Sequence, residues 1–183
     1  DGVFNMNPKE FNYMNLHLLQ RSVHSYNGKT FAELIHGGRC MIRTDIPLLG
    51  ASDSEYQGRH VKGMDAKDME EVIALCVEFA HQARRSGFDG IMMHFAHGWL
   101  FHDFLSPLSN HRADEFGGSV ENRCRFPLMA LKAVREVIGD DLLIELRLNG
   151  NDEMEGGITP EDAAQQALIF QDYADMIHIT CST

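Results

Sequence analysis

The stretch Gly87–Trp99, which reads GFDGIMMHFAHGW, decides the fold of this chain. A glycine ends a helical pattern, a short apolar strand follows, and the strand opens into His94 and His97. In α/β proteins, chemistry is usually placed at the carboxyl ends of parallel strands. These two histidines are therefore the first candidates for a functional site.

The same order of helix and strand occurs four times along the chain. The predicted strands cover residues 30–35, 91–93, 142–148 and 176–180. The residues expected to cap the helices are Asn7, Asp65, Ser119 and Thr159. Each has a side-chain oxygen that can accept from the first backbone N–H groups of a helix. The alternation predicts an α/β fold with a parallel sheet.

The predicted links from strand to helix are long. Residues 40–63 and 95–118 show no clear period, and we interpret both as loops. Long loops at the carboxyl ends of strands are typical of a TIM barrel or a doubly wound sheet. Closing a barrel takes about eight strands, and an open sheet has two edges that invite association. We therefore interpret the chain as part of a larger fold, in which exposed sheet edges could support a homo-oligomer.

The composition argues against several classes of partner. The 183 residues carry a net charge of -11, which disfavours binding to nucleic acid or to an anionic membrane. No apolar run approaches the ~20 residues of a membrane span, and the first residues lack the features of a signal peptide. The four cysteines form no CxxC pair, so we expect free thiols and a cytoplasmic location.

His94 and His97 allow three interpretations. As metal ligands they lack a helical HExxH context, and residues three apart in a strand point to opposite faces. One of them could instead be a buried structural donor. They fit best as paired donors to a substrate oxygen, where two neutral imidazoles stabilise developing negative charge. The two rings converge only if the backbone turns after His94, which Gly98 would help.

Two charged side chains interrupt apolar strands. Arg147 lies near the end of a strand of leucine and isoleucine, and a buried arginine is costly unless it is paired. It either forms a salt bridge with Glu33 or Glu145, or presents its charge to an electron-rich ligand. Glu33 either faces a ligand at the carboxyl end of its strand or is an ordinary half-exposed residue.

Five motifs carry a further signal. They are ELIHGGR (33–39), GFDG (87–90), HFAHG (94–98), FLSPLSN (104–110) and DEFGGSVENR (114–123). Together with Arg147 they resemble the Old Yellow Enzyme family, the FMN-dependent NADH:flavin oxidoreductases and ene-reductases. The resemblance implies that residues 1–183 form a single incomplete TIM-barrel segment, with the third to sixth strands and their helices. FMN would lie at the carboxyl-terminal mouth of the complete barrel.

The resemblance also implies roles for individual residues. In the family, the histidines that match His94 and His97 bind the substrate oxygen. The arginine that matches Arg147 stabilises negative charge on the reduced flavin. The implied reaction transfers a hydride from NAD(P)H to FMN and then to an activated alkene, a small-molecule substrate. The family's FMN phosphate site lies in its last strands, so we expect the 183 residues alone to be inactive and to bind FMN weakly.

Two positions depart from the family pattern. Glu33 replaces a glutamine that contacts the flavin, and an ionised carboxylate can only accept a hydrogen bond. Glu33 would need a proton, or a bond to Arg147, to keep that contact. Trp99 replaces a proton-donating tyrosine, and an indole is not a useful acid. We predict His94, His97 and Trp99 as the catalytic residues and Glu33 and Arg147 as cofactor-binding residues, with no metal.

Two other functions stay open at the level of sequence. The chain could be a flavin-free barrel fragment that acts as a binding or self-associating scaffold. It could also be part of a metal-dependent hydrolase that uses His94 and His97.

Overall fold

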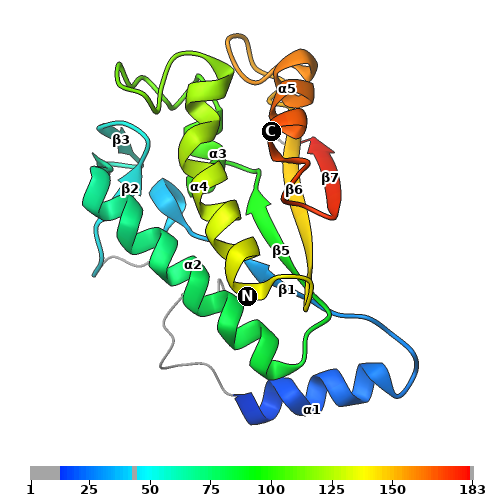
Figure 1. Cartoon of the computed structure of the whole chain (residues 1–183). Coiled ribbons are helices and arrows are strands. Elements are labelled where there is room, and N and C mark those ends of the chain that lie inside the picture. Colours follow the sequence, from blue (N-terminus) through cyan, green and yellow to red (C-terminus); the bar gives the residue numbers. More distant parts are fainter. Residues whose placement is uncertain (1–12, 43–44, 182–183) are drawn as a thin grey trace.

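Four parallel strands form the centre of the computed structural model, which describes residues 13–42 and 45–181 (Figure 1). In spatial order the strands are β1 (Phe31–Leu34), β5 (Gly90–Phe95), β6 (Leu143–Asn151) and β7 (Met176–Cys181). Each neighbouring pair is parallel. The predicted α/β architecture and its four strands are confirmed, and β6 extends three residues beyond the predicted end.

Three helices connect these strands and cover one side of the sheet: α2 (Ala66–Ser86), α4 (Val120–Ile138) and α5 (Pro160–Phe170). A further helix, α1 (Tyr13–His24), precedes β1 and packs against α2. The predicted caps Asp65, Ser119 and Thr159 are confirmed, since each side chain accepts from the backbone N–H three residues further on. The predicted start of the first helix near Asn7 lies outside the described residues.

Both predicted long loops contain regular structure, so that part of the sequence interpretation is wrong. The first loop holds the end of η2 (Gly38–Cys40) and a small sheet of β2 (Leu48–Gly50), β3 (Ser54–Tyr56) and β4 (Arg59–Gly63). The second loop holds the short helix α3 (Leu100–Leu105), in which every residue is buried. Elements of three to six residues are too short to produce a recognisable period.

The two faces of the central sheet differ in character. Along β5, the side chains of Ile91, Met93 and Phe95 are fully buried. The ring of Phe95 lies 4.5 Å from that of Phe101 in α3 and 5.7 Å from that of Phe170 in α5. This is the face that the helices cover, with α2 and α4 in front of the sheet in Figure 1. Alternate residues point to the opposite face.

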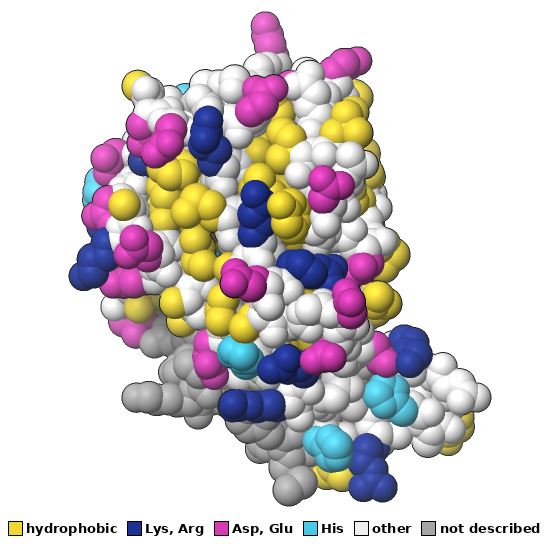
Figure 2. Space-filling model, viewed as in Figure 1, with side chains coloured by type: hydrophobic (Ala, Val, Ile, Leu, Met, Phe, Trp, Pro, Cys, Tyr) yellow, Lys and Arg dark blue, Asp and Glu magenta, His cyan; other side chains and the backbone are white. Residues whose placement is uncertain are grey.

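The outer surface of the helices is mixed in character. In Figure 2, acidic, basic and hydrophobic side chains alternate over α2 and α4. Among the described residues, no helix combines the length and the apolar composition that crossing a membrane requires.

The amino ends of the strands are held together by Asp89. Its carboxylate accepts from Lys29 Nζ and His24 Nε2, both at 2.8 Å, and from the backbone N–H of Thr30 at 2.9 Å. Burial opposes its charge, but these bonds together hold the pKa of Asp89 well below its usual range. This end of the sheet is therefore tied by structural interactions, and the polar groups considered next lie toward the other end.

Candidate active site

Polar side chains gather on the face of the sheet that the helices leave uncovered. The strand register places Glu33 beside Met92, His94 beside Arg147, and Arg147 beside His178. Registered neighbours in a parallel sheet project to the same side. The polar residues of this face are Glu33, His94, Glu145, Arg147, Asn149, His178 and Thr180. A sheet face of this kind suits a polar ligand better than a packed core.

His94 and His97 converge because the backbone turns directly after β5. His97 and Gly98 both adopt left-handed conformations, with φ of 60° and 73°. The turn brings His97 Nδ1 to 3.0 Å from His94 Nε2, with the ring centroids 4.9 Å apart. The ring of Trp99 stands edge-on to His94, at a centroid distance of 6.4 Å. The structure thus brings together the three residues that the sequence analysis assigned to catalysis.

Hydrogen bonds extend this pair in both directions. Glu33 Oε1 lies 2.6 Å from His94 Nδ1, and His97 Nε2 lies 3.2 Å from Thr180 Oγ1. The Glu33 side chain is 44% exposed, whereas that of His94 is only 4% exposed. A continuous chain of four groups therefore runs from a solvent-accessible carboxylate on β1 to a hydroxyl near the end of β7.

The turn formed by His97 and Gly98, called the histidine turn below, is held in place by a buried network that the sequence analysis missed. The backbone N–H of His97 donates to Asn149 Oδ1 at 3.2 Å, and that of Gly98 donates to His102 Nδ1 at 3.1 Å. Because Nδ1 of His102 accepts, the ring proton belongs on Nε2. That Nε2 donates to Asp152 Oδ1 at 2.9 Å. The left-handed turn is thereby tied to a buried carboxylate.

Asp152 accepts three more hydrogen bonds. They come from Ser106 Oγ at 2.7 Å, the backbone N–H of Ile158 at 2.9 Å and Asn149 Nδ2 at 3.0 Å. Burial opposes the charged form, but these bonds and that from His102 together keep the pKa of Asp152 well below its usual range. No pattern in the sequence joins these residues, since His102 and Asp152 lie 50 positions apart in the chain.

Arg147 does not form either of the salt bridges considered from the sequence. Glu33 is bonded to His94, and Glu145 lies 2.9 Å from His178 Nδ1. The Nε atom of Arg147 is buried and has no hydrogen-bond partner among the described residues. A buried donor without a partner costs free energy, so this atom is a natural contact for a ligand on the polar face.

Burial and neighbouring charge keep the two site histidines neutral. Burial, together with His94 and Arg147, lowers the pKa of His97 to about 4. Burial also lowers the pKa of His94, although Glu33 partly opposes the shift. At neutral pH both rings therefore have one N–H donor and one acceptor nitrogen.

Replacing Arg147 by glutamine should raise the pKa of His97 toward the ordinary value of about 6.5. The substitution removes a positive charge that disfavours the imidazolium ion. A pH titration of the His97 ring protons by NMR measures the change. Arg125→Gln, at an exposed position of α4, serves as the control and should leave this pKa unchanged. An unchanged or lower pKa in Arg147→Gln would show that the two groups do not interact.

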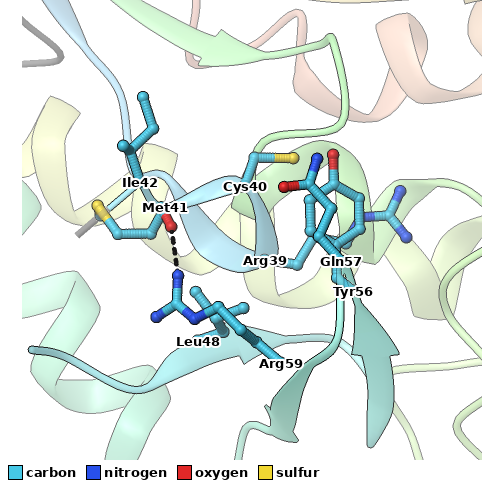
Figure 3. Close-up of a pocket in the computed structure, with 8 residues that line it drawn as sticks. All are labelled: Arg39, Cys40, Met41, Ile42, Leu48, Tyr56, Gln57 and Arg59. Atoms are coloured by element: carbon cyan, nitrogen blue, oxygen red, sulfur yellow. Dashed lines mark hydrogen bonds between the residues drawn. The ribbon is translucent and has the colours of Figure 1, made fainter. Parts of the chain in front are cut away.

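A cavity of about 330 Å³ lies next to the η2 segment and the small sheet (Figure 3). Its lining residues are Arg39, Cys40, Met41, Ile42, Leu48, Tyr56, Gln57 and Arg59. The thiol of Cys40 donates to the carbonyl oxygen of Gly98 at 3.5 Å, so the cavity wall contacts the turn. Arg59 crosses the cavity and donates to the carbonyl oxygen of Met41 at 2.9 Å.

A metal site is not evident in the part of the chain that the structure describes. No group of three or more His, Cys, Asp or Glu side chains there is arranged to hold a metal ion. His102, the next histidine along the chain, contributes both ring nitrogens to the buried network.

The chain matches proteins of known type over most of its length. A family model described as "NADH:flavin oxidoreductase / NADH oxidase family" matches residues 9–182. An NADPH dehydrogenase of Clostridium acetobutylicum is 36% identical over 168 residues, which cover 90% of this chain and 50% of that protein. An NADH oxidase of Thermoanaerobacter brockii is 35% identical over 159 residues, covering 84% of this chain and 24% of that protein.

Solved structures show the same architecture. The old yellow enzyme homologue from Zymomonas mobilis superimposes with a TM-score of 0.82 at 26% sequence identity. The match covers 97% of this chain and 54% of that structure. The chain spans about half or less of the length of these relatives. Because it matches this enzyme's structure over nearly its whole length, its four strands and helices form part of a TIM barrel.

Proposed function

Because this chain belongs to the NADH:flavin oxidoreductase / NADH oxidase family, we propose that it forms the central part of an FMN-dependent ene-reductase. The complete protein would transfer a hydride from NAD(P)H through FMN to an α,β-unsaturated carbonyl compound. The observation that carries this proposal is the buried, unpartnered Nε of Arg147 beside His94.

The residues of the polar face fit a flavin. The guanidinium of Arg147 would contact the flavin ring and stabilise negative charge on it when the ring is reduced. Glu33, whose side chain is 44% exposed, would lie beside the same ligand. FMN, when bound, supplies the site at which a hydride is accepted and passed on. His94, His97 and Trp99 would then face the substrate from the carboxyl end of β5.

The 183 residues alone should not bind FMN at micromolar affinity, since they span only part of their relatives. Titration of the chain into FMN, followed by flavin fluorescence, measures this. The natural polypeptide that contains the chain should be purified with FMN and should reduce 2-cyclohexenone with NADPH. Arg147→Leu in that polypeptide should weaken FMN retention, whereas Arg125→Gln should not. A colourless natural polypeptide without NADPH-dependent reduction would contradict the proposed function.

The edges of the sheet favour one alternative. β1 and β7 are the outer strands of the described sheet, and β7 exposes Met176 and Ile179. Exposed strand edges with apolar side chains promote association. The alternative function is therefore a flavin-free fragment that acts as a scaffold and self-associates through these edges. Sedimentation of a colourless dimer would favour this alternative.

A further inference from the structure

The chain of groups from Glu33 to Thr180 has two self-consistent arrangements of protons. A neutral imidazole has one donor and one acceptor nitrogen. If Glu33 is ionised, it accepts from His94 Nδ1–H, and His94 Nε2 then accepts from His97 Nδ1–H. His97 Nε2 is left as an acceptor for the hydroxyl of Thr180.

A proton on Glu33 reverses every one of these bonds. The carboxyl group then donates to His94 Nδ1, and His94 Nε2–H donates to His97 Nδ1. His97 now carries its proton on Nε2, which points along the chain toward Thr180. Only in this second arrangement does His97 Nε2 offer an N–H, because in the first arrangement both ring protons are used within the chain.

We propose that Glu33, His94 and His97 form a proton relay, in which Glu33 takes up a proton from solvent and His97 releases one from Nε2. Three protons each move by one position. The Nε2 proton of His97 leaves, the Nε2 proton of His94 moves to His97 Nδ1, and the carboxyl proton of Glu33 moves to His94 Nδ1. The relay returns to its starting state when Glu33 takes a proton from water and the remaining proton of each imidazole passes from Nδ1 back to Nε2 by exchange with solvent.

The geometry meets the requirements of such a relay. Its three contacts measure 2.6, 3.0 and 3.2 Å, all within hydrogen-bond distance. The entrance is the exposed Glu33, and the interior ring of His94 is almost completely buried. The side chain of Trp99 beside His94 carries only an indole N–H, which is not a useful acid.

The surrounding charges favour neutral rings, which the relay needs. The groups that face His94 and His97 are Glu33 from β1, Arg147 from β6 and His102 from α3. On the same sheet face, Glu145 and His178 are occupied with each other. Burial and Arg147 lower the pKa of both rings, so a proton is passed on by a change of tautomer instead of being stored as an imidazolium ion.

The use of the relay in alkene reduction rests on the proposed function. With FMN bound and NAD(P)H as the reductant, one carbon of the alkene would gain a hydride and with it two electrons. The other carbon would gain the proton that His97 releases. Glu33 is a relay residue in this scheme, since it acts on the substrate only through His94 and His97.

The ring nitrogens of the ¹⁵N-labelled 183-residue chain report the relay without any flavin. NMR spectra of the histidine rings distinguish Nδ1–H, Nε2–H and imidazolium forms. As Glu33 gains a proton, followed by its carboxyl carbon shift, the neutral fractions of His94 and His97 should change together from Nδ1–H to Nε2–H. In Glu33→Gln this joint change should disappear, because an amide does not titrate.

Glu145→Gln is the matched control. It removes a carboxylate that pairs with a histidine on the same face, at 2.9 Å, but that has no bond to His94 or His97. The joint tautomer change should persist in this variant. An unchanged tautomer in the wild type, an imidazolium at His94 paired with ionised Glu33, or a persisting change in Glu33→Gln would overturn the relay.

Activity separates the relay from the proposed function. In the flavin-loaded natural polypeptide, Glu33→Gln should slow alkene reduction by about 100-fold or more, with little change for Glu136→Gln at an exposed position of α4. FMN reduction by NADPH should continue in both variants. A tautomer change without any alkene reduction would refute the proposed function but leave the relay intact. Full alkene reduction by Glu33→Gln would refute the relay alone.

Discussion

Asp152→Ala is expected to lower the free energy of unfolding by about 3–5 kcal/mol, the usual cost of removing one partner from a buried charged network. The carboxylate is almost completely buried and accepts from four donors. The donors that would lose their acceptor are His102 Nε2, Asn149 Nδ2, Ser106 Oγ and the backbone N–H of Ile158. Each buried donor without a partner is destabilising by itself.

Urea unfolding followed by circular dichroism measures this loss. Glu155→Ala, an exposed position in the same loop, removes the same charge and should cost little. The pKa of Asp152 is depressed in the folded chain, so its contribution is present above the unfolded value of about 3.9. The difference between wild type and Asp152→Ala should therefore shrink as the pH falls below that value. A difference that stays constant at low pH would mean that the charge is not what stabilises the loop.

The same substitution should disturb the histidine turn. Without Asp152, His102 and Asn149 lose the group that orients them, and these two side chains hold the N–H groups of Gly98 and His97. The amide resonances of the turn should shift in Asp152→Ala and stay in place in Glu155→Ala.

The central sheet could be predicted because its signals are local. Strands of apolar residues, cap residues and terminal glycines are each recognised within a few positions of the chain. Asp65 and Gly87, for example, bound α2 as predicted. The small sheet of β2, β3 and β4 could not be predicted in this way, since its strands have only three to five residues.

The candidate site depended on contacts between distant parts of the chain. The sequence showed that His94 and His97 could meet if the backbone turned, and the turn is present. It did not show that Glu33 pairs with His94, because strand register joins residues 61 positions apart. Of the two alternatives for Arg147, the salt bridge is not formed, since both neighbouring carboxylates bond to histidines.

Phe101→Ala should also lower the free energy of unfolding by about 3–5 kcal/mol, the range for truncating a buried phenylalanine. Phe101 is fully buried in α3, with ring centroids 4.5 Å from Phe95 and 5.5 Å from Phe126. It thus fills the space between the central strand β5 and the helix α4. The truncation would leave a cavity in the centre of the aromatic cluster.

The matched control is Leu168→Ala on α5, where the side chain is 63% exposed. Its truncation should change the free energy of unfolding by no more than about 0.5 kcal/mol. A similarly small loss in Phe101→Ala would indicate that α3 is only loosely attached to the core. A large loss would establish α3 as part of the core. His102, which accepts from the Gly98 N–H of the histidine turn, follows Phe101 in the same short helix. The packing of the Phe101 ring would then also hold His102 in position.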